Sequence, residues 1–91
     1  MTDQMPTTTE IIATVKQHIL DRFLPDEDPA NLTATTPLLS GGILDSISTI
    51  ELVAFLEKQF SVKFEAYEVG EERLDTLQKI AETVHAKLAA K

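Results

Sequence analysis

The chain has 91 residues, enough for one domain with a modest core but too few for an elaborate active-site cleft. Fifteen acidic and eight basic residues give a net charge of −7, which argues against nucleic acid and anionic membranes as partners. The absence of cysteine excludes disulfides, thiolate metal sites and a cysteine nucleophile. No secretory signal is visible, and no apolar run is long enough for membrane insertion. We therefore expect a single cytoplasmic domain over residues 1–91.

A first long helix is predicted to follow a capping box, Thr7-Thr8-Thr9-Glu10. Behind this box, apolar residues recur at steps of three and four, as on the core face of a helix. They are Ile12, Val15, Ile19, Leu20, Phe23 and Leu24. Pro25 disfavours helical geometry at the residue before it, so this helix should end near Leu24. Residues 1–6 are expected to form a flexible N-terminus.

A long loop is predicted between Pro25 and Leu44, because prolines, glycines and threonines punctuate this stretch. Leu32, Leu38 and Leu39 are expected to pin the loop to the core. A second long helix should run from about Ser46 to Phe60, where no helix breaker occurs. Its core face is predicted to hold Leu52, Val53, Leu56 and Phe60, and its outer face Ile47, Glu51, Ala54 and Lys58.

The C-terminal third predicts one short helical turn and a last long helix. The turn is expected around Glu68–Arg73, and the helix should begin at an acid cap, Asp75, with Gln78 three residues later. Its core stripe is Leu77, Ile80, Ala81, Val84 and Leu88, and residues 89–91 are expected to fray. No strand pattern of useful length appears. The predicted fold is all-α, a small bundle of three long helices and one short helix.

Ser46 follows a glycine-containing loop and stands at the start of the second helix. Unpaired backbone N–H groups and the helix dipole favour an anion there, so this hydroxyl is well placed to carry a phosphate. Ser46 could also be only an N-cap, unless Asp45 fills that role and leaves the serine outward. A hydrolase nucleophile is poorly supported, because no Gly-x-Ser-x-Gly motif is present and no spacing ties His18 or His85 to the serine.

The sequence predicts neither catalytic residues nor a metal site. The acidic cluster Asp26-Glu27-Asp28 lacks the ligand spacing and glycine of an EF-hand loop, so a solvated turn is the better interpretation. Residues 45–75 hold eight acids against three bases. These acids either keep a small domain in solution or form a docking face for basic partner enzymes.

Gly42-Ile43-Leu44-Asp45-Ser46-Ile47, followed by Glu51-Leu52, Leu56-Glu57 and Phe60, resembles the motif of acyl, aminoacyl and peptidyl carrier proteins. The resemblance extends back to Thr35-Thr36-Pro37-Leu38-Leu39 and forward to Asp75-Thr76-Leu77. It implies that a phosphopantetheinyl transferase attaches 4′-phosphopantetheine from coenzyme A to Ser46, and that Asp45 helps this transferase recognise the site. It also implies a monomer without catalytic activity that holds acyl or aminoacyl groups as thioesters.

The partners implied by the resemblance are a loading ligase or acyltransferase and downstream synthase or transferase enzymes. Five residues are expected to contact them: Leu44, Ile47, Glu51, Ala54 and Glu57. Ile47 stands apart as a branched apolar residue on the outer face. It is either covered by the first turn and the preceding loop, or exposed as a contact that a partner buries.

The choice of pathway depends on departures from the pattern of fatty-acid carriers. Leu44 replaces their usual alanine, Ser48-Thr49 occupies a place where an acid is common, and Lys58 follows Glu57 where a second acid often stands. The sequence is more similar to free-standing aminoacyl carriers, including D-alanyl carriers, and to small carriers of polyketide and nonribosomal peptide pathways. A general fatty-acyl carrier and a helical interaction module without a prosthetic group are the alternatives.

Overall fold

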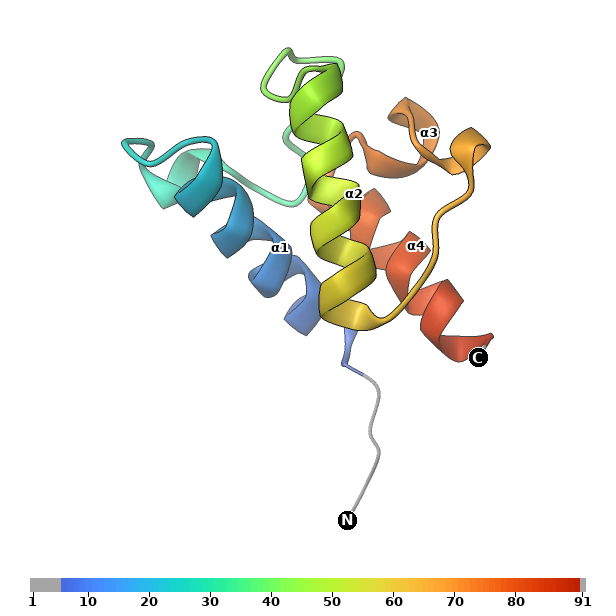
Figure 1. Ribbon diagram of the computed structural model, residues 1–91. Helices are drawn as coiled ribbons and strands as arrows, with labels where there is room; N and C mark the ends of the chain where they lie inside the picture. Colours follow the sequence, from blue (N-terminus) through green and yellow to red (C-terminus); the bar gives the residue numbers. More distant parts are fainter. Residues whose placement is uncertain (1–5, 91) are drawn as a thin grey trace.

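The computed structural model describes residues 6–90, and within this range the chain is all-helical (Figure 1). Its elements are α1 (Thr8–Arg22), α2 (Ser46–Phe60), α3 (Glu71–Leu74) and α4 (Leu77–Ala89), with two short 3-10 turns at Pro29–Asn31 and Ala66–Glu68. Three long helices, one short helix and a long connection from α1 to α2 confirm the predicted fold class. Residues 1–5 and 91, parts of the ends predicted to be flexible or frayed, lie outside the described residues.

Helix α1 begins at the predicted capping box. The Glu10 N–H donates to Thr7 Oγ1 over 3.1 Å, and the Thr7 N–H donates to Glu10 Oε1 over 2.8 Å. Ile11 is fully buried although the predicted stripe began one residue later, at Ile12, which is only partly buried. The helix ends at Arg22, two residues before the predicted end.

The core lies where α1, α2 and α4 meet and extends under the long loop. It consists mainly of leucine, isoleucine and valine side chains that are almost completely withdrawn from water: Ile11, Val15, Ile19, Leu32, Leu38, Leu52, Leu56, Leu74, Leu77, Ile80 and Val84. Burying one such side chain contributes about 1.5–3 kcal/mol, so this cluster is the main source of stability. As predicted, Leu32 and Leu38 pin the loop to the helices.

The predicted cap of α4 is wrong by one residue. Thr76, not Asp75, is the N-cap, and its hydroxyl accepts the Lys79 N–H over 3.0 Å. Both residue types cap helices well. Asp75 turns instead toward the long loop, where its carboxylate accepts hydrogen bonds from Leu39 and Ser40. A tertiary contact therefore takes the carboxylate away from the helix, and the neighbouring threonine caps it.

The orientation of α2 decides where Ser46 is presented. Figure 1 shows that α2 starts at one end of the bundle, whereas α1 starts and α4 finishes toward the opposite end. Ser46 is the first residue of α2. The bundle therefore carries this serine at an end that the other long helices leave open.

Candidate functional site

The loop before Ser46 is closed by its own hydrogen bonds. The Gly42 N–H donates to the Leu39 carbonyl over 3.1 Å, and the Leu44 N–H donates to the Leu38 carbonyl over 2.9 Å. Gly42 adopts a φ of 79°, in the left-handed region that favours glycine. At Gly41 a Cβ atom would lie 2.4 Å from the backbone oxygen of Pro37. Two adjacent glycines are therefore needed for a turn this tight.

Asp45 fills the N-cap of α2 and leaves Ser46 outward. Its carboxylate accepts the Ser48 N–H over 2.8 Å, and its carbonyl accepts the Thr49 hydroxyl over 2.7 Å. Hydrogen bonding from Ser48, first from the backbone N–H and then from the side chain, lowers the pKa of Asp45, so the carboxylate is charged at neutral pH. Ser46 is exposed in the first turn, which agrees with the alternative in which Asp45 is the cap.

An open hollow of about 500 Å³ lies beside the serine. Leu39 and Leu44 from the loop, Ile50 from α2 and Val69 from the segment before α3 supply its apolar lining, and Ser46 lies at the same hollow. A flexible group attached to the Ser46 hydroxyl would therefore find apolar surface within immediate reach.

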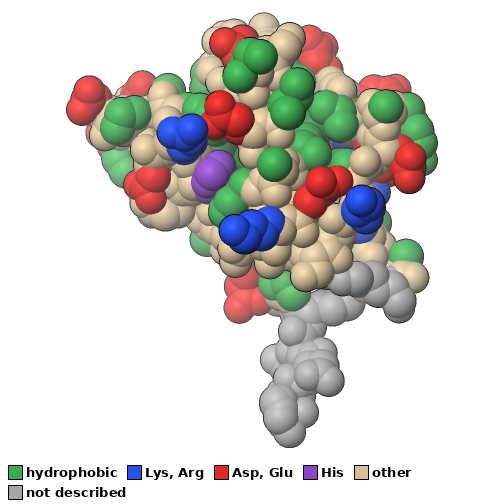
Figure 2. All heavy atoms as spheres, in the orientation of Figure 1, with side chains coloured by type: hydrophobic (Ala, Val, Ile, Leu, Met, Phe, Trp, Pro, Cys, Tyr) green, Lys and Arg blue, Asp and Glu red, His purple; other side chains and the backbone are tan. Residues whose placement is uncertain are grey.

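The outer face of α2 exposes two isoleucines near the start of the helix. Ile47 is 66% exposed and Ile50 is 61% exposed, and apolar side chains project at this end of α2 in Figure 2. The exposed position of Ile47 rules out the interpretation in which it is covered by the loop. Ile50 was not predicted, although it follows Ile47 by three residues and so shares its side of the helix.

Two residues predicted to contact partners make structural contacts within the molecule. Leu44 is only 3% exposed and belongs to the core, so it offers almost no surface to a partner, and this prediction is corrected. Glu57 is partly buried, and its carboxylate accepts the Phe64 N–H over 2.8 Å, which fastens the chain after α2 back onto the helix. Glu51 and Ala54 lie as predicted on the outer side, and Glu51 pairs with Arg22 at 3.0 Å.

The acids between residues 45 and 75 do not form one continuous docking face. Four of these eight carboxylates accept a backbone N–H inside the molecule: Asp45, Glu57, Glu68 and Asp75. Glu68 is nearly buried and also pairs with Lys87 at 2.7 Å. Figure 2 shows acidic, basic and apolar side chains mixed over the face that it presents. Half of these acids therefore also fasten the backbone, in addition to any part they have in docking.

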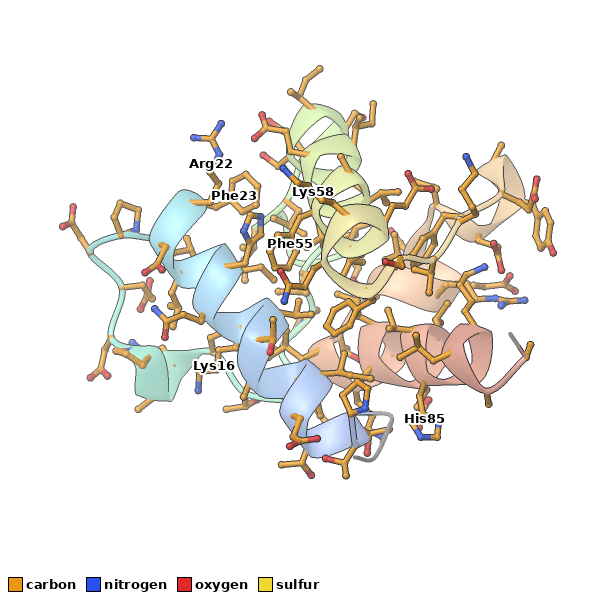
Figure 3. The ribbon with its side chains drawn as sticks, turned by 60° about the horizontal axis from the view of Figure 1, so that its bottom comes forward. Lys16, Arg22, Phe23, Phe55, Lys58 and His85 are labelled. Carbon is orange, nitrogen blue, oxygen red and sulfur yellow. The ribbon has the colours of Figure 1, made fainter. Side chains whose placement is uncertain are left out.

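The two histidines lie on α1 and α4, and neither belongs to α2, which carries Ser46. His18 stacks on Phe55 with ring centroids 3.8 Å apart and meets Phe23 edge to face, so it fills the contact between α1 and α2. Burial, followed by the charge of Arg22, lowers its pKa. His85 lies on α4, well apart from this cluster (Figure 3). Both positions fit the predicted role as surface or core-edge residues.

Two further properties of residues 6–90 bear on function. Over this range, His, Cys, Asp and Glu side chains nowhere gather in a group of three that could hold a metal ion. None of the helices in the same range has the length and apolar character needed to cross a membrane.

Comparison with known proteins places this chain in a family. Residues 9–84 match the family described as "Phosphopantetheine attachment site". The chain is 38% identical over 73 residues to the D-alanyl carrier protein of Streptococcus uberis, an alignment that covers 78% of this chain and 91% of that protein. A shorter alignment, 38% identical over 47 residues, covers 52% of this chain and 60% of the D-alanyl carrier protein of Streptococcus pyogenes serotype M5.

These matches confirm the resemblance that the sequence predicts. The family is one of carriers that hold a prosthetic group and do not themselves catalyse reactions. The chain belongs to the phosphopantetheine attachment site family and is a carrier protein that resembles D-alanyl carrier proteins.

Proposed function

We propose that Ser46 is the attachment residue of this carrier and receives the 4′-phosphopantetheine group of coenzyme A from a phosphopantetheinyl transferase. The proposal rests on one observation at the start of α2: the helix is capped by Asp45, and Ser46 is left free of that role. Asp45 takes the capping role, with its carboxylate 2.8 Å from the Ser48 nitrogen, and the Ser46 hydroxyl stays exposed in the first turn. A serine needed only as a cap would not be arranged in this way.

The start of α2 suits a phosphodiester for electrostatic reasons. A negative group near an exposed helix N-terminus is stabilised by about 0.3–1 kcal/mol through the dipole and the free N–H groups. The tight loop before the helix holds this end of α2 without covering the serine. The attachment point is therefore both accessible to a second enzyme and favourable for the product.

Asp45 is proposed to contribute its charge to recognition by the transferase, in addition to capping α2. Replacing Asp45 by asparagine separates these two roles, because the amide keeps an oxygen that can accept the Ser48 N–H but carries no charge. We expect Asp45→Asn to keep its helix content and to be modified more slowly than the wild type. Equal modification rates would limit Asp45 to capping.

The prosthetic group supplies a thiol on a flexible arm, which holds the cargo as a thioester. Tethering raises the effective concentration of the cargo at a partner's active site, commonly to about millimolar for a short flexible linker. The residues of this chain then have two tasks, to present the arm at the open end of the bundle and to offer partners a contact surface. We place this surface at Ile47, Glu51 and Ala54 on the outer side of α2, with Ile50 beside them.

The proposed cargo is an aminoacyl group, with D-alanyl as the first candidate. Support comes from the D-alanyl carrier proteins at 38% identity. The start of α2 is also poor in acids, because Ser48 and Thr49 stand there and Thr49 is buried. This argues against partners that require a continuous acidic face on the helix. A polyketide, nonribosomal peptide or fatty-acyl carrier is the competing outcome of the loading test below.

Intact mass spectrometry tests the attachment directly. The chain is incubated with coenzyme A and a broad-specificity phosphopantetheinyl transferase, and a gain of about 340 Da marks one prosthetic group. Ser46→Ala should abolish the gain. Ser48→Ala, a serine in the same helical turn, is the matched control and should leave it unchanged. If several transferases give no gain, the chain is a non-covalent interaction module instead.

Loading of the modified chain then tests the cargo. The modified protein is offered D-alanine, L-amino acids, aryl acids and fatty acids, each with ATP and a ligase that activates that class. We expect thioester formation with an aminoacyl group and preference for D-alanine. Preferential loading by a fatty-acyl ligase would overturn the aminoacyl proposal while leaving the attachment at Ser46 intact.

A further inference from the structure

Asp75 connects the junction between α3 and α4 to the loop that precedes Ser46. One carboxylate oxygen, Oδ1, accepts two consecutive backbone N–H groups, from Leu39 over 2.9 Å and from Ser40 over 2.8 Å. The other oxygen, Oδ2, accepts the Ser40 hydroxyl over 2.7 Å. The backbone carbonyl of Asp75 accepts the Leu38 N–H as well. A single residue therefore holds three successive loop residues.

The same loop residues lead to the start of α2. The Leu38 carbonyl accepts the Leu44 N–H, and Leu44 directly precedes Asp45, the cap of the helix. A second hydrogen bond connects α4 to the same loop: the Gln78 N–H in the first turn of α4 donates to the Ala34 carbonyl over 3.0 Å. The hydrogen bonds thus run without a gap from Asp75 through the loop to the residue before the cap.

We infer that Asp75 is a positioning residue, which clamps residues 38–40 so that the loop sets Ser46 in place for modification. The inference rests on the proposed attachment at Ser46. It assigns Asp75 no contact with substrate or prosthetic group, since its side chain acts through the loop backbone. A carboxylate suits this task because, when charged, it is an acceptor only and can satisfy three donors at once.

The clamp is stronger when Asp75 is charged. Hydrogen bonds from Ser40, first its N–H and then its hydroxyl, lower the pKa of Asp75, and the Leu39 N–H and the charge of Lys79 on α4 act in the same direction. Because the folded pKa lies below the ordinary value of 3.8, the clamp is intact above that value and weakens as the pH falls through the folded pKa.

Two variants and one control test the clamp. Asp75→Asn keeps the oxygen that accepts both N–H groups but does not titrate, and Asp75→Ala removes all three side-chain acceptor contacts. Asp26→Asn, an exposed aspartate in the same long connection, is the matched control. NMR follows the amide shifts of Leu39 and Ser40 against pH together with the exchange of these amides, and mass spectrometry follows the rate at which Ser46 is modified.

We expect the wild-type Leu39 and Ser40 amides to shift together below about pH 4, while the same amides of Asp75→Asn stay constant. In Asp75→Ala their exchange should rise about tenfold or more, since each lost hydrogen bond changes an equilibrium by about that factor. Modification should slow about threefold or more in Asp75→Ala, as fewer molecules hold the competent loop. It should recover at least in part in Asp75→Asn, whose amide oxygen can still accept the Leu39 and Ser40 N–H groups.

The inference is overturned if the two amides do not titrate in the wild type, or if Asp75→Ala is modified at the wild-type rate. Should Asp75→Ala fail to fold, the titration of the wild type against Asp75→Asn decides. A wild-type chain that no transferase modifies would refute the proposed attachment, whereas the amide titration would still report whether the clamp exists. The two failures are therefore distinguishable.

Discussion

Replacing Ile47 by alanine should impair transfer by partner enzymes while leaving the fold almost unchanged. Ile47 is 66% exposed, so only about a third of its side chain leaves water on folding. Full burial of isoleucine contributes about 1.5–3 kcal/mol, and a third of that value limits the loss in unfolding free energy to about 0.5–1 kcal/mol. A change of 1 kcal/mol shifts Tm by about 4–8 °C in a domain of this size, so the decrease in Tm should not exceed that range.

Leu56→Ala in the same helix is the matched control for folding. Its side chain is completely buried, and removing buried leucine carbons costs about 2–5 kcal/mol because a cavity remains. The two variants should therefore differ by at least about 1 kcal/mol, or about 4 °C in Tm, unless Ile47 has a hidden packing role. Helix content measured by circular dichroism during thermal unfolding gives both values.

The functional half of the experiment measures initial rates of modification and of cargo loading for Ile47→Ala and Ile47→Asp. We expect both rates to fall, more for aspartate, because a charge in an apolar contact must be desolvated when the partner binds. If Ile47→Ala lost 2 kcal/mol or more of stability, the side chain would be part of the core and the reasoning would be wrong. Unchanged rates in Ile47→Asp would remove Ile47 from the contact surface.

Three other substitutions test the remaining arguments. Gly41→Ala should cost about 1–3 kcal/mol in urea unfolding, because its Cβ would meet the Pro37 oxygen, whereas Gly70→Ala, with open space around it, should be nearly neutral. The pKa of His18 is lowered mainly by burial, so the unfolded chain takes up the proton first as the pH falls. The wild type should therefore lose unfolding free energy below about pH 6.5, and His18→Gln should lack this pH dependence. Glu51→Lys breaks the exposed pair with Arg22 at a cost of at most about 1 kcal/mol, and it should slow transfer most at low salt if partners are basic. Equal stability of the two glycine variants would contradict the first argument, and the same pH dependence of stability in His18→Gln as in the wild type would contradict the second. Transfer by Glu51→Lys that does not depend on salt would contradict the third.

The long helices were predictable from the sequence because local spacing determines them. Apolar residues at steps of three and four placed Val15, Ile19, Ile80 and Val84 in the core, and the capping box located the start of α1. The cap of α4 was not decided locally, because Asp75 and Thr76 are both good caps. The choice depends on the loop more than thirty residues earlier, which takes up the Asp75 carboxylate.

Part of the site was also predictable, because local sequence determines it. The start of the second helix at Ser46 and the choice between Asp45 and Ser46 as its cap are local, and in the structure α2 begins at Ser46 with Asp45 as the cap. The burial of Leu44 and the inward turn of Glu57 depend on packing between distant segments, which a helical wheel does not include. Ile50 could have been found, since it lies three residues after Ile47 on the same helix.

The placement of α2 has a practical consequence for experiments on this protein. Because α1 starts and α4 finishes toward the end of the bundle away from Ser46, a linker at either place points away from the proposed attachment site (Figure 1). The protein can then be fixed to a sensor surface or fused to a reporter with the serine facing solution. A chain immobilised in this way would allow modification, loading and partner binding to be measured in succession on the same molecules.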